Sequence, residues 1–382
     1  MMKNLFKLFC LLAVISIATV SCDKDDNDDD LNQIDPENFQ GELTEGTYTL
    51  DPEKTYKLTG LVYVNEGAEL VIPAGTLIEA TGGTSAAIIV KQGGKIFVNG
   101  TKEAPVVMTS GLATKKAGDW GGLVICGRAT CNSGGGISEV GDSPYGGTTD
   151  NDDSGVIKYL RIEYSGAAFN SEKEYNGFSL FGVGSGTVIE YVQIYENADD
   201  GIEFYGGTVT ANYIIVANVE DDMFDWTEGW NGSGSYWFGK NDQGYGNRGM
   251  ECDNWSTNHS ATPVANPTIS NVTLIGSGDQ GNEPQGMELR AGTQGTINNV
   301  VLKDWKHGIR VSGDVSNGYM GDELTVSNVK FIDCVVKVTA RNNAGESFEI
   351  PEGFYSENES ATGAGAGASV PAWAQGWTIG LE

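Results

Sequence analysis

Four carboxylates occupy equivalent places in a short unit that recurs along the chain. The unit is a small residue followed by apolar, polar and apolar residues. Its polar position is filled in turn by Ser179, Glu203, Asp225, Glu251, Glu288 and Arg310, in steps of 24, 22, 26, 37 and 22 residues. If the units stack, acids about 5 Å apart repel by roughly 1 kcal/mol in water and about 3 kcal/mol at an effective dielectric of 20. A bound cation or protonation would relieve this repulsion.

We call this series of stacked polar positions the column. Further acids lie near it in the sequence and favour a metal site. Asp199, Asp200, Asp221, Asp222 and Glu228 lie beside its members in the sequence. Carboxylate oxygens are the hard ligands that calcium prefers. The calcium ligands that we predict are Asp200, Glu203, Asp222, Asp225, Glu251 and Glu288. The alternative is a solvated acidic face, outside the core, with Arg248, Arg290 and Arg310 as its counter-charges.

Aromatic residues gather in the same part of the sequence, where residues 227–248 have the composition of a loop between repeats. Aromatic faces with polar rims are typical of sugar-binding sites. The ligand-binding residues that we predict are Trp230, Tyr236, Trp237 and Trp255. In the alternative interpretation these side chains pin the loop to the body of the protein.

Two other functions remain open from the residues alone. In a glycoside hydrolase, Asp200 and Asp222 could act as general acid and base of an inverting reaction, which needs carboxyl groups about 6.5–9.5 Å apart. In a polysaccharide lyase, Arg290 or Arg310 could act as the base beside a calcium-bound uronate. A structural or adhesive spacer would have no small-ligand site. A fold shared with known enzymes does not decide among these functions.

The acidity of the chain narrows its partners. The 382 residues include 52 Asp and Glu, 23 Lys and Arg and two His, for a formal charge of −29. Nucleic-acid-binding proteins carry basic patches that neutralise phosphates. We therefore expect no nucleic-acid partner, whereas cations and sugars remain possible ligands.

The spacing of the units predicts the architecture that must position these side chains. Short stretches of alternating polar and apolar residues, rich in β-branched and aromatic types and bounded by Gly and Asn, indicate strands. Two strands recur every 22–26 residues. A propeller blade needs about 40 residues, so this period favours a solenoid of the parallel β-helix type. We predict an all-β fold with the β-helix at residues 43–345 and loop insertions.

The N-terminal residues have the features of an export signal. Lys3 and Lys7 precede the apolar stretch 8–20, which is too short to span a bilayer. A small residue then precedes Cys22, in an arrangement that resembles the cleavage and lipid-attachment site of bacterial lipoproteins. We therefore predict a signal peptide at residues 1–21 and lipidation of Cys22.

After signal removal, we expect a lipid anchor to the outer membrane and no transmembrane segment. Residues 22–42 are predicted to be a flexible acidic tether, since a block of like charges stays extended. This block resembles the signal that carries Bacteroidota lipoproteins to the cell surface. A spacer facing the periplasm is the alternative.

Four sequence segments carry a resemblance to a known family, namely residues 72–76, 104–110, 118–123 and 221–232. They resemble signature segments of a right-handed parallel β-helix family of Bacteroidota surface lipoproteins with a pectin-lyase-like fold. The resemblance spans residues 40–382 and implies fold and location, but no activity. Residues 346–382 are expected to be a flexible Gly/Ala-rich segment followed by a cap for the open end of the solenoid, containing Trp373 and Trp377. The predicted function is binding of a glycan or other extracellular ligand beside the acidic, calcium-binding face.

Overall fold

The computed structural model describes residues 33–140, 142–170, 173–278 and 284–382. The predicted signal peptide, Cys22 and most of the predicted tether lie outside these residues. In the described part of the chain, no helix has the length and apolar character needed to cross a membrane.

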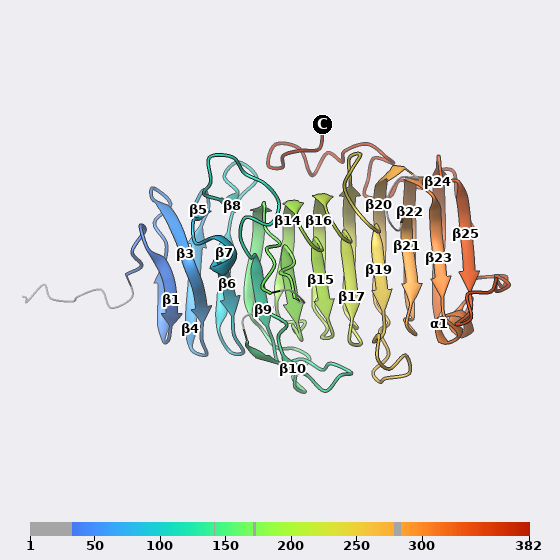
Figure 1. Ribbon diagram of the computed structural model, residues 1–382, viewed down its shortest axis with the longest axis horizontal. Coiled ribbons are helices and arrows are strands. Elements are labelled where there is room, and N and C mark those ends of the chain that lie inside the picture. Colours follow the sequence, from blue (N-terminus) through green and yellow to red (C-terminus); the bar gives the residue numbers. More distant parts are fainter. Residues whose placement is uncertain (1–32, 141, 171–172, 279–283) are drawn as a thin grey trace, which may run out of the picture. The chain divides into compact units, whose positions relative to one another are not determined.

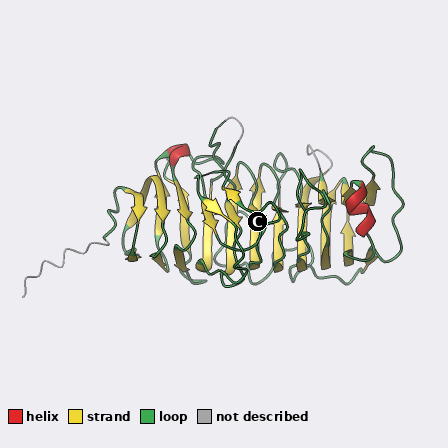
Figure 2. Cartoon of the chain, turned by 90° about the horizontal axis from the view of Figure 1, so that it is seen from below, coloured by secondary structure: helices red, strands yellow, loops and turns green. Residues whose placement is uncertain are grey.

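The described chain is an all-β solenoid, as predicted (Figures 1 and 2). Its main sheet contains 24 strands, and neighbouring strands in this sheet run parallel to one another. One stack of short strands forms what we call the column face. Its strands are β6 (Ala87–Val90), β9 (Leu123–Cys126), β13 (Phe178–Phe181), β15 (Ile202–Tyr205), β17 (Phe224–Thr227), β19 (Met250–Asp253), β21 (Gln285–Arg290), β23 (His307–Ser312) and β25 (Val336–Arg341).

A series of longer strands completes the wall of the solenoid. They are β12 (Gly155–Glu163), β14 (Val188–Asn197), β16 (Thr210–Val219), β18 (Ser233–Lys240), β20 (Thr268–Gly278), β22 (Gly295–Trp305) and β24 (Leu324–Ile332). The N-terminal rungs contain β1 (Phe39–Leu43), β2 (Gly46–Thr49), β3 (Thr55–Val64), β4 (Ala68–Pro73), β5 (Leu77–Ala80), β7 (Lys95–Asn99) and β8 (Val106–Ser110). The remaining elements are the hairpin of β10 (Gly136–Ile137) and β11 (Pro144–Tyr145), β26 (Tyr355–Glu357), and the short helices η1 (Gly83–Ser85) and α1 (Asp314–Tyr319).

Each long strand turns a corner near its middle, at a residue with left-handed backbone geometry. These residues are Tyr159, Tyr191, Tyr213, Tyr236, Asn271, Asn299 and Asn328, with φ between 49° and 61°. Such φ values are unfavourable for most side chains but less so for Asn. The stacked position supplies compensation: the rings of Tyr191 and Tyr213 stack at 4.4 Å, and Asn299 Nδ2 donates to Asn271 Oδ1 at 2.7 Å.

We call the stacked corner residues the corner ladder. Replacing Asn299 tests how much this ladder stabilises the fold. Its side chain also accepts hydrogen bonds from the backbone N–H groups of Thr362 and Gly363, at 2.9 and 3.2 Å. We expect Asn299→Ala to lower the free energy of unfolding by about 2 kcal/mol, through lost hydrogen bonds and backbone strain. Asn328→Ala is the matched control: it has the same backbone geometry but no bond to residues 362–363, so a loss of about 1 kcal/mol is expected. Urea denaturation measures both, and equal losses would contradict this account.

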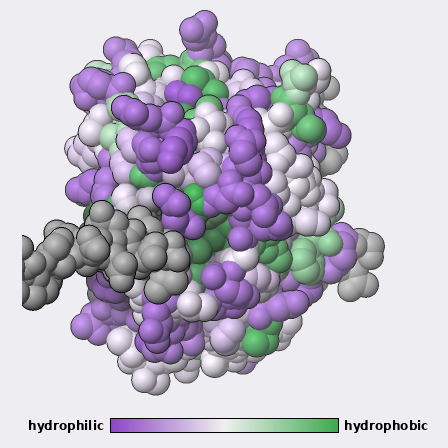
Figure 3. All heavy atoms as spheres, turned by 90° about the vertical axis from the view of Figure 1, so that its left-hand side faces the viewer, coloured by the Kyte–Doolittle hydropathy of each residue, from purple (hydrophilic) through white to green (hydrophobic). Residues whose placement is uncertain are grey.

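Side chains that alternate along the strands fill the interior of the solenoid. In its middle, aromatic rings stack from rung to rung: Phe204 on Trp230 at 4.2 Å and Phe224 on Trp237 at 4.7 Å. All four side chains are fully buried. The expected loop at residues 227–248 is therefore wrong for the part that forms β18, because its alternation places Trp237 inward. The end of the solenoid shown in Figure 3 is largely hydrophilic.

The C-terminal residues do not cap the end of the solenoid, contrary to expectation. They run back along its flank, over the long strands (Figure 1). Trp377 packs edge-on against Tyr159 at 5.5 Å, and Trp373 packs against Tyr213 at 5.3 Å. Gln193 anchors the segment by exchanging two hydrogen bonds, of 2.7 and 3.0 Å, with the backbone of Ile379. The two indoles cover the edges of the stacked corner tyrosines. Burial of these aromatic edges explains why the segment lies along the flank.

The limits of the β-helix also differ slightly from the predicted 43–345. Strands begin with β1 at Phe39 and end with β26 at Glu357. Strands β1 and β26 both belong to the solenoid, because β1 pairs in parallel with β3 and β26 pairs in parallel with β24. The solenoid therefore takes in part of the predicted tether and part of the predicted flexible segment.

Candidate functional site

The predicted column of polar side chains exists, because the repeated units lie in register. Glu203 pairs with Asp225, Asp225 with Glu251, and Glu251 with Glu288, on the neighbouring strands β15, β17, β19 and β21. Ser179 precedes the column and Arg310 follows it in the same register. The inward neighbours in each strand fill the core, so the column lies on the outer side of the column face.

The column is nevertheless not an open, solvated surface. Glu203 and Asp225 are each only 8% exposed and Glu288 is 1% exposed. Side chains from loops outside the strands, including Glu139 and Trp255, line the cavity that the column borders. The alternative of an acidic face is therefore wrong in one respect, because these carboxylates are not solvated. Burial makes the uncompensated charges far more costly than they are in water.

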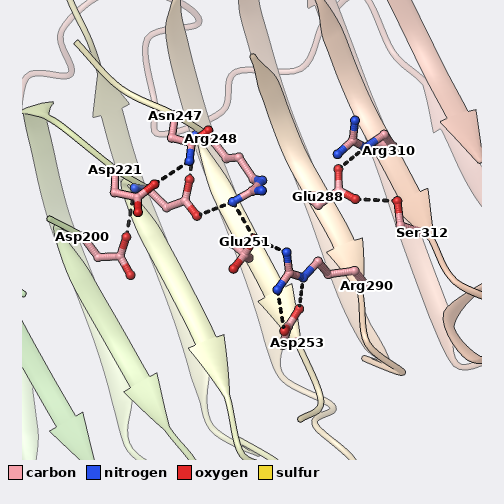
Figure 4. A network of polar contacts seen from close by, with 11 residues as sticks. Asp200, Asp221, Asn247, Arg248, Glu251, Asp253, Glu288, Arg290, Arg310 and Ser312 are labelled. Carbon is pink, nitrogen blue, oxygen red and sulfur yellow. Dashed lines mark hydrogen bonds and ion pairs between the residues drawn. The ribbon is translucent and has the colours of Figure 1, made fainter. Parts of the chain in front are cut away.

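Arginines neutralise one half of the column. Glu251 lies 2.5 Å from Arg248 Nη1 and 2.8 Å from Arg290 Nη1 (Figure 4). Arg290 also contacts both oxygens of Asp253, through Nε at 2.8 Å and Nη2 at 3.2 Å. For Glu251 and Asp253, arginine counter-charges, rather than a bound cation, are therefore the better description.

Glu288 belongs to the same neutralised half. Its two oxygens bind Arg310 Nε and, at 2.5 Å, Ser312 Oγ. It does not line the acidic cavity. Glu288 is therefore removed from the predicted calcium ligands.

The other half of the column has no such neutralisation. We call Asp199, Asp200, Glu203 and Asp225 the acid cluster. None of them forms an ion pair with a Lys or Arg of the described residues. Glu203 accepts a hydrogen bond from Asn176 Nδ2 at 2.7 Å, and Asp200 accepts one from the backbone N–H of Asp222 at 2.9 Å.

Asp225 stands out within the acid cluster. Its Oδ1 atom is buried and has no hydrogen-bond partner among the described residues. A buried carboxylate oxygen normally has a donor or a cation beside it. Its position at the wall of the cavity therefore identifies a place where a positive ligand would be stabilised.

The geometry suits a small cation. Asp200, Glu203 and Asp225 each offer an oxygen, and the three oxygens lie within 4.8 Å of one another. Two further groups satisfy the same limit, one of Asp199, Asp200 and Asp221 and one of Asp222, Asp225 and Glu251. Calcium uses six to eight oxygen ligands in flexible geometry. The sequence therefore predicted three residues that meet, Asp200, Glu203 and Asp225, as well as Asp222 and Glu251 beside them.

The electrostatics of the acid cluster follow from burial and mutual repulsion. Burial, together with the charges of Asp221 and Glu174, raises the pKa of Asp199 to about 7. Burial raises the pKa of Asp225 well above its usual range, and the charges of Glu203 and Glu251 add to this effect. The pKa values of Asp200 and Glu203 are likewise raised, mainly by burial.

The cavity beside the acid cluster has a volume of about 320 Å³. Its lining includes residues that the sequence prediction missed: Glu139, Asn176, Tyr205 and Asp253. Asp253 follows Glu251 by two residues in β19, so strand alternation could have placed it on the same face. Glu139 comes from the loop that contains β10 and β11, and no periodic signal marks it.

The predicted sugar-binding aromatics separate in the structure. Trp230 and Trp237 are fully buried in the core, so the prediction is wrong for these two. Tyr236 is half-buried and stacks on Tyr213 at 4.8 Å in the corner ladder, and it does not line the cavity. Trp255 is half-buried and does line it.

Of the four residues predicted for catalysis, Asp200 lines the acidic cavity, whereas the other three are poorly placed for that role. Asp222 is 2% exposed, binds the backbone N–H and guanidinium of Arg248, and is absent from the cavity lining. Asp253 and Glu251 raise the pKa of Arg290, which opposes the loss of a proton that a base requires. Arg310 binds Glu288 and does not line the acidic cavity.

A comparison with protein families agrees with the fold. A family model described as a pectate-lyase like beta helix domain matches residues 41–378. No curated protein matches the chain. Among solved structures, the enzymatically active domain of tailspike protein 2 of bacteriophage CBA120 is similar at 13% identity, with a TM-score of 0.24. That alignment covers 78% of this chain and 42% of the tailspike chain.

Proposed function

Since this chain belongs to the pectate-lyase-like β-helix domain family, we propose that it uses the acid cluster to bind calcium and, beside the ion, a carbohydrate. The observation that carries the proposal is the buried Oδ1 atom of Asp225, which has no hydrogen-bond partner in the described structure. Asp200 and Glu203, which also have no basic partner among the described residues, each offer an oxygen in the same group as Asp225. A cation supplies the missing counter-charge.

The chemistry of the ligand atoms favours calcium. All three members of the central group offer carboxylate oxygens, and no imidazole or thiolate lines the acidic cavity. Such oxygen-only sites suit calcium and magnesium, and a group spread over several strands favours the more flexible coordination of calcium. Three protein residues leave coordination positions for water or for ligand oxygens.

The surroundings of the cation favour a sugar as the second ligand. The cavity has a polar lining, with Trp255 at its edge and Asn176 and Ser256 as hydrogen-bonding groups. Sugar hydroxyls can occupy open positions on calcium, while the indole of Trp255 provides an apolar face. We further propose that the protein is a surface lipoprotein anchored to the outer membrane through Cys22, for which the sequence of the first 30 residues is the support.

A binding experiment tests the two parts of the proposed function separately. Isothermal titration calorimetry with calcium chloride should show saturable binding that EDTA reverses. A panel of neutral and uronic-acid oligosaccharides, applied with calcium and with EDTA, should show binding only with calcium. Trp255→Ala should weaken sugar binding at least ten-fold and leave calcium affinity unchanged. Absence of calcium uptake, or sugar binding that persists in EDTA, would contradict the proposal.

A further inference from the structure

A second cavity of about 290 Å³ adjoins the acidic one. The two cavities share Ser256 and Arg290 as lining residues. The remaining lining residues of the second cavity are His259, Ala291, Ser312, Gly313, Asn342 and Asn343. This set contains no carboxylate, whereas carboxylates dominate the first cavity. The two cavities therefore offer different chemistry along one continuous stretch of the surface.

The loop between the two cavities is held in place by a buried asparagine. Asn254 is 0% exposed and donates through Nδ2 to the carbonyls of His259 and Ala261, at 3.1 and 3.0 Å. Its Oδ1 accepts from the backbone N–H of Ala265 at 2.9 Å and from Asn132 Nδ2 at 2.7 Å. These bonds fix the loop that carries Trp255, Ser256 and His259, so its polar groups are presented in a defined position.

Arg290 lies where the two cavities meet. Its guanidinium is oriented by two contacts with Asp253 and one with Glu251, at 2.8–3.2 Å. Because these two acids already balance its charge, Arg290 is a poor site for another anion. A guanidinium has five N–H donors, so donors remain for uncharged oxygen atoms. Sugar hydroxyls are acceptors of that kind.

The far side of the second cavity also carries uncharged hydrogen-bonding groups. Asn343 is exposed, and its Oδ1 accepts from the backbone N–H of Asp314 at 3.1 Å, while no hydrogen bond of its Nδ2 is seen within the described residues. His259 belongs to the same lining. Amide and imidazole donors of this type match the hydroxyl groups of a neutral sugar unit.

We propose that the second cavity is a carbohydrate subsite for an uncharged sugar unit, and that one extended oligosaccharide occupies both cavities, passing Arg290 at their junction. The inference rests on the proposed function, since the other end of the ligand lies beside the cation. The combined lining runs from the rung of β13 to that of β25, seven neighbouring strands. At about 4.8 Å per strand this is roughly 29 Å, which is the length of several sugar units and far more than one.

The test compares short and long ligands in the presence of calcium. Two-unit and six-unit members of three series are titrated: cello-oligosaccharides, manno-oligosaccharides and oligogalacturonides. For a neutral series that binds, the six-unit member should bind at least ten-fold more tightly than the two-unit member, whereas oligogalacturonides, in which every unit is charged, should gain much less. Asn343→Ala and His259→Ala should each remove most of this difference and leave calcium affinity unchanged. Asn38→Ala, at an exposed asparagine beside the first rung, should change neither quantity.

The outcomes separate this inference from the proposed function. Three results overturn the second subsite and leave the first site intact: equal affinity for two-unit and six-unit members of a neutral series that binds, an equally large length gain for oligogalacturonides, or a length dependence that survives both substitutions in the second cavity. Failure of all three series to bind, with calcium uptake confirmed, overturns the carbohydrate part of the proposed function and the inference with it.

Discussion

Calcium is expected to raise the melting temperature of this protein by about 5–10 °C at pH 8 and by much less at pH 5. The acid cluster forms no ion pair with a basic side chain of the described residues, and protons compete less with a cation for its oxygens at pH 8 than at pH 5, so a bound cation stabilises the folded state more at pH 8. At a concentration 1,000-fold above its dissociation constant, a ligand contributes about 4 kcal/mol. For a large domain this corresponds to a shift of several degrees.

The direction of the pH effect follows from the raised pKa values. A carboxyl group whose pKa is higher in the folded state binds its proton more tightly there, so folding is favoured at low pH. The pKa of Asp199 rises from 3.8 to about 7. Through Asp199, stability without calcium should therefore fall as pH rises from about 4 to about 7, and the raised pKa values of the other buried acids extend this fall to higher pH. At 1.36 kcal/mol per pKa unit, Asp199 alone accounts for about 4 kcal/mol.

Differential scanning calorimetry at pH 5 and pH 8, with EDTA and with millimolar calcium, measures these effects. Without calcium the protein should melt at a higher temperature at pH 5 than at pH 8. Magnesium serves as the comparison ion, and it should stabilise less than calcium because it prefers rigid octahedral geometry and retains its water. A melting temperature that is independent of calcium at pH 8 would show that the acid cluster is not a cation site.

The sequence predicted the column because its physical basis is periodic. Alternation places Glu203 and Asp225 on the same side of their strands, and steps of 22–26 residues bring successive strands into register. The step of 37 residues between Glu251 and Glu288 did not disturb the pairing, since the extra residues lie outside the strands. The same register brings Asp253 beside Arg290, and this ion pair was therefore accessible to sequence reasoning.

Other features depend on contacts that no period encodes. Glu139 reaches the cavity from an inserted loop, and the burial of the column depends on where such loops fold back. The assignment of Trp230 and Trp237 to the surface failed because glycines at 232 and 234 gave residues 227–248 the composition of a loop, whereas Ser233–Lys240 form a strand of the wall. The flank position of Trp373 and Trp377 required knowledge of the tyrosine edges that they cover.

The two halves of the column should respond in opposite ways to removal of a negative charge. At pH 8 without calcium, Asp225→Asn is expected to raise the free energy of unfolding by about 1–3 kcal/mol. It removes a buried acidic group that has no ion pair within the described residues and whose ionisation is opposed by burial and by neighbouring carboxylates, and its amide can donate to those carboxylates. Glu288→Gln is expected to lower the free energy of unfolding by about 1–3 kcal/mol, because it weakens the charge-assisted bonds from Arg310 and Ser312.

The two variants should also differ in how much calcium stabilises them. Asp225→Asn should lose most of the stabilisation by calcium, since it removes a central ligand, whereas Glu288→Gln should retain it. Urea denaturation of both variants with and without calcium gives the four free energies required. Loss of stability in both variants without calcium would mean that Asp225 already has a compensating partner. Retention of the calcium effect in Asp225→Asn would place the cation elsewhere. The predicted combination, a variant that is more stable alone but insensitive to calcium, is expected only where a ligand-binding carboxylate destabilises the empty fold.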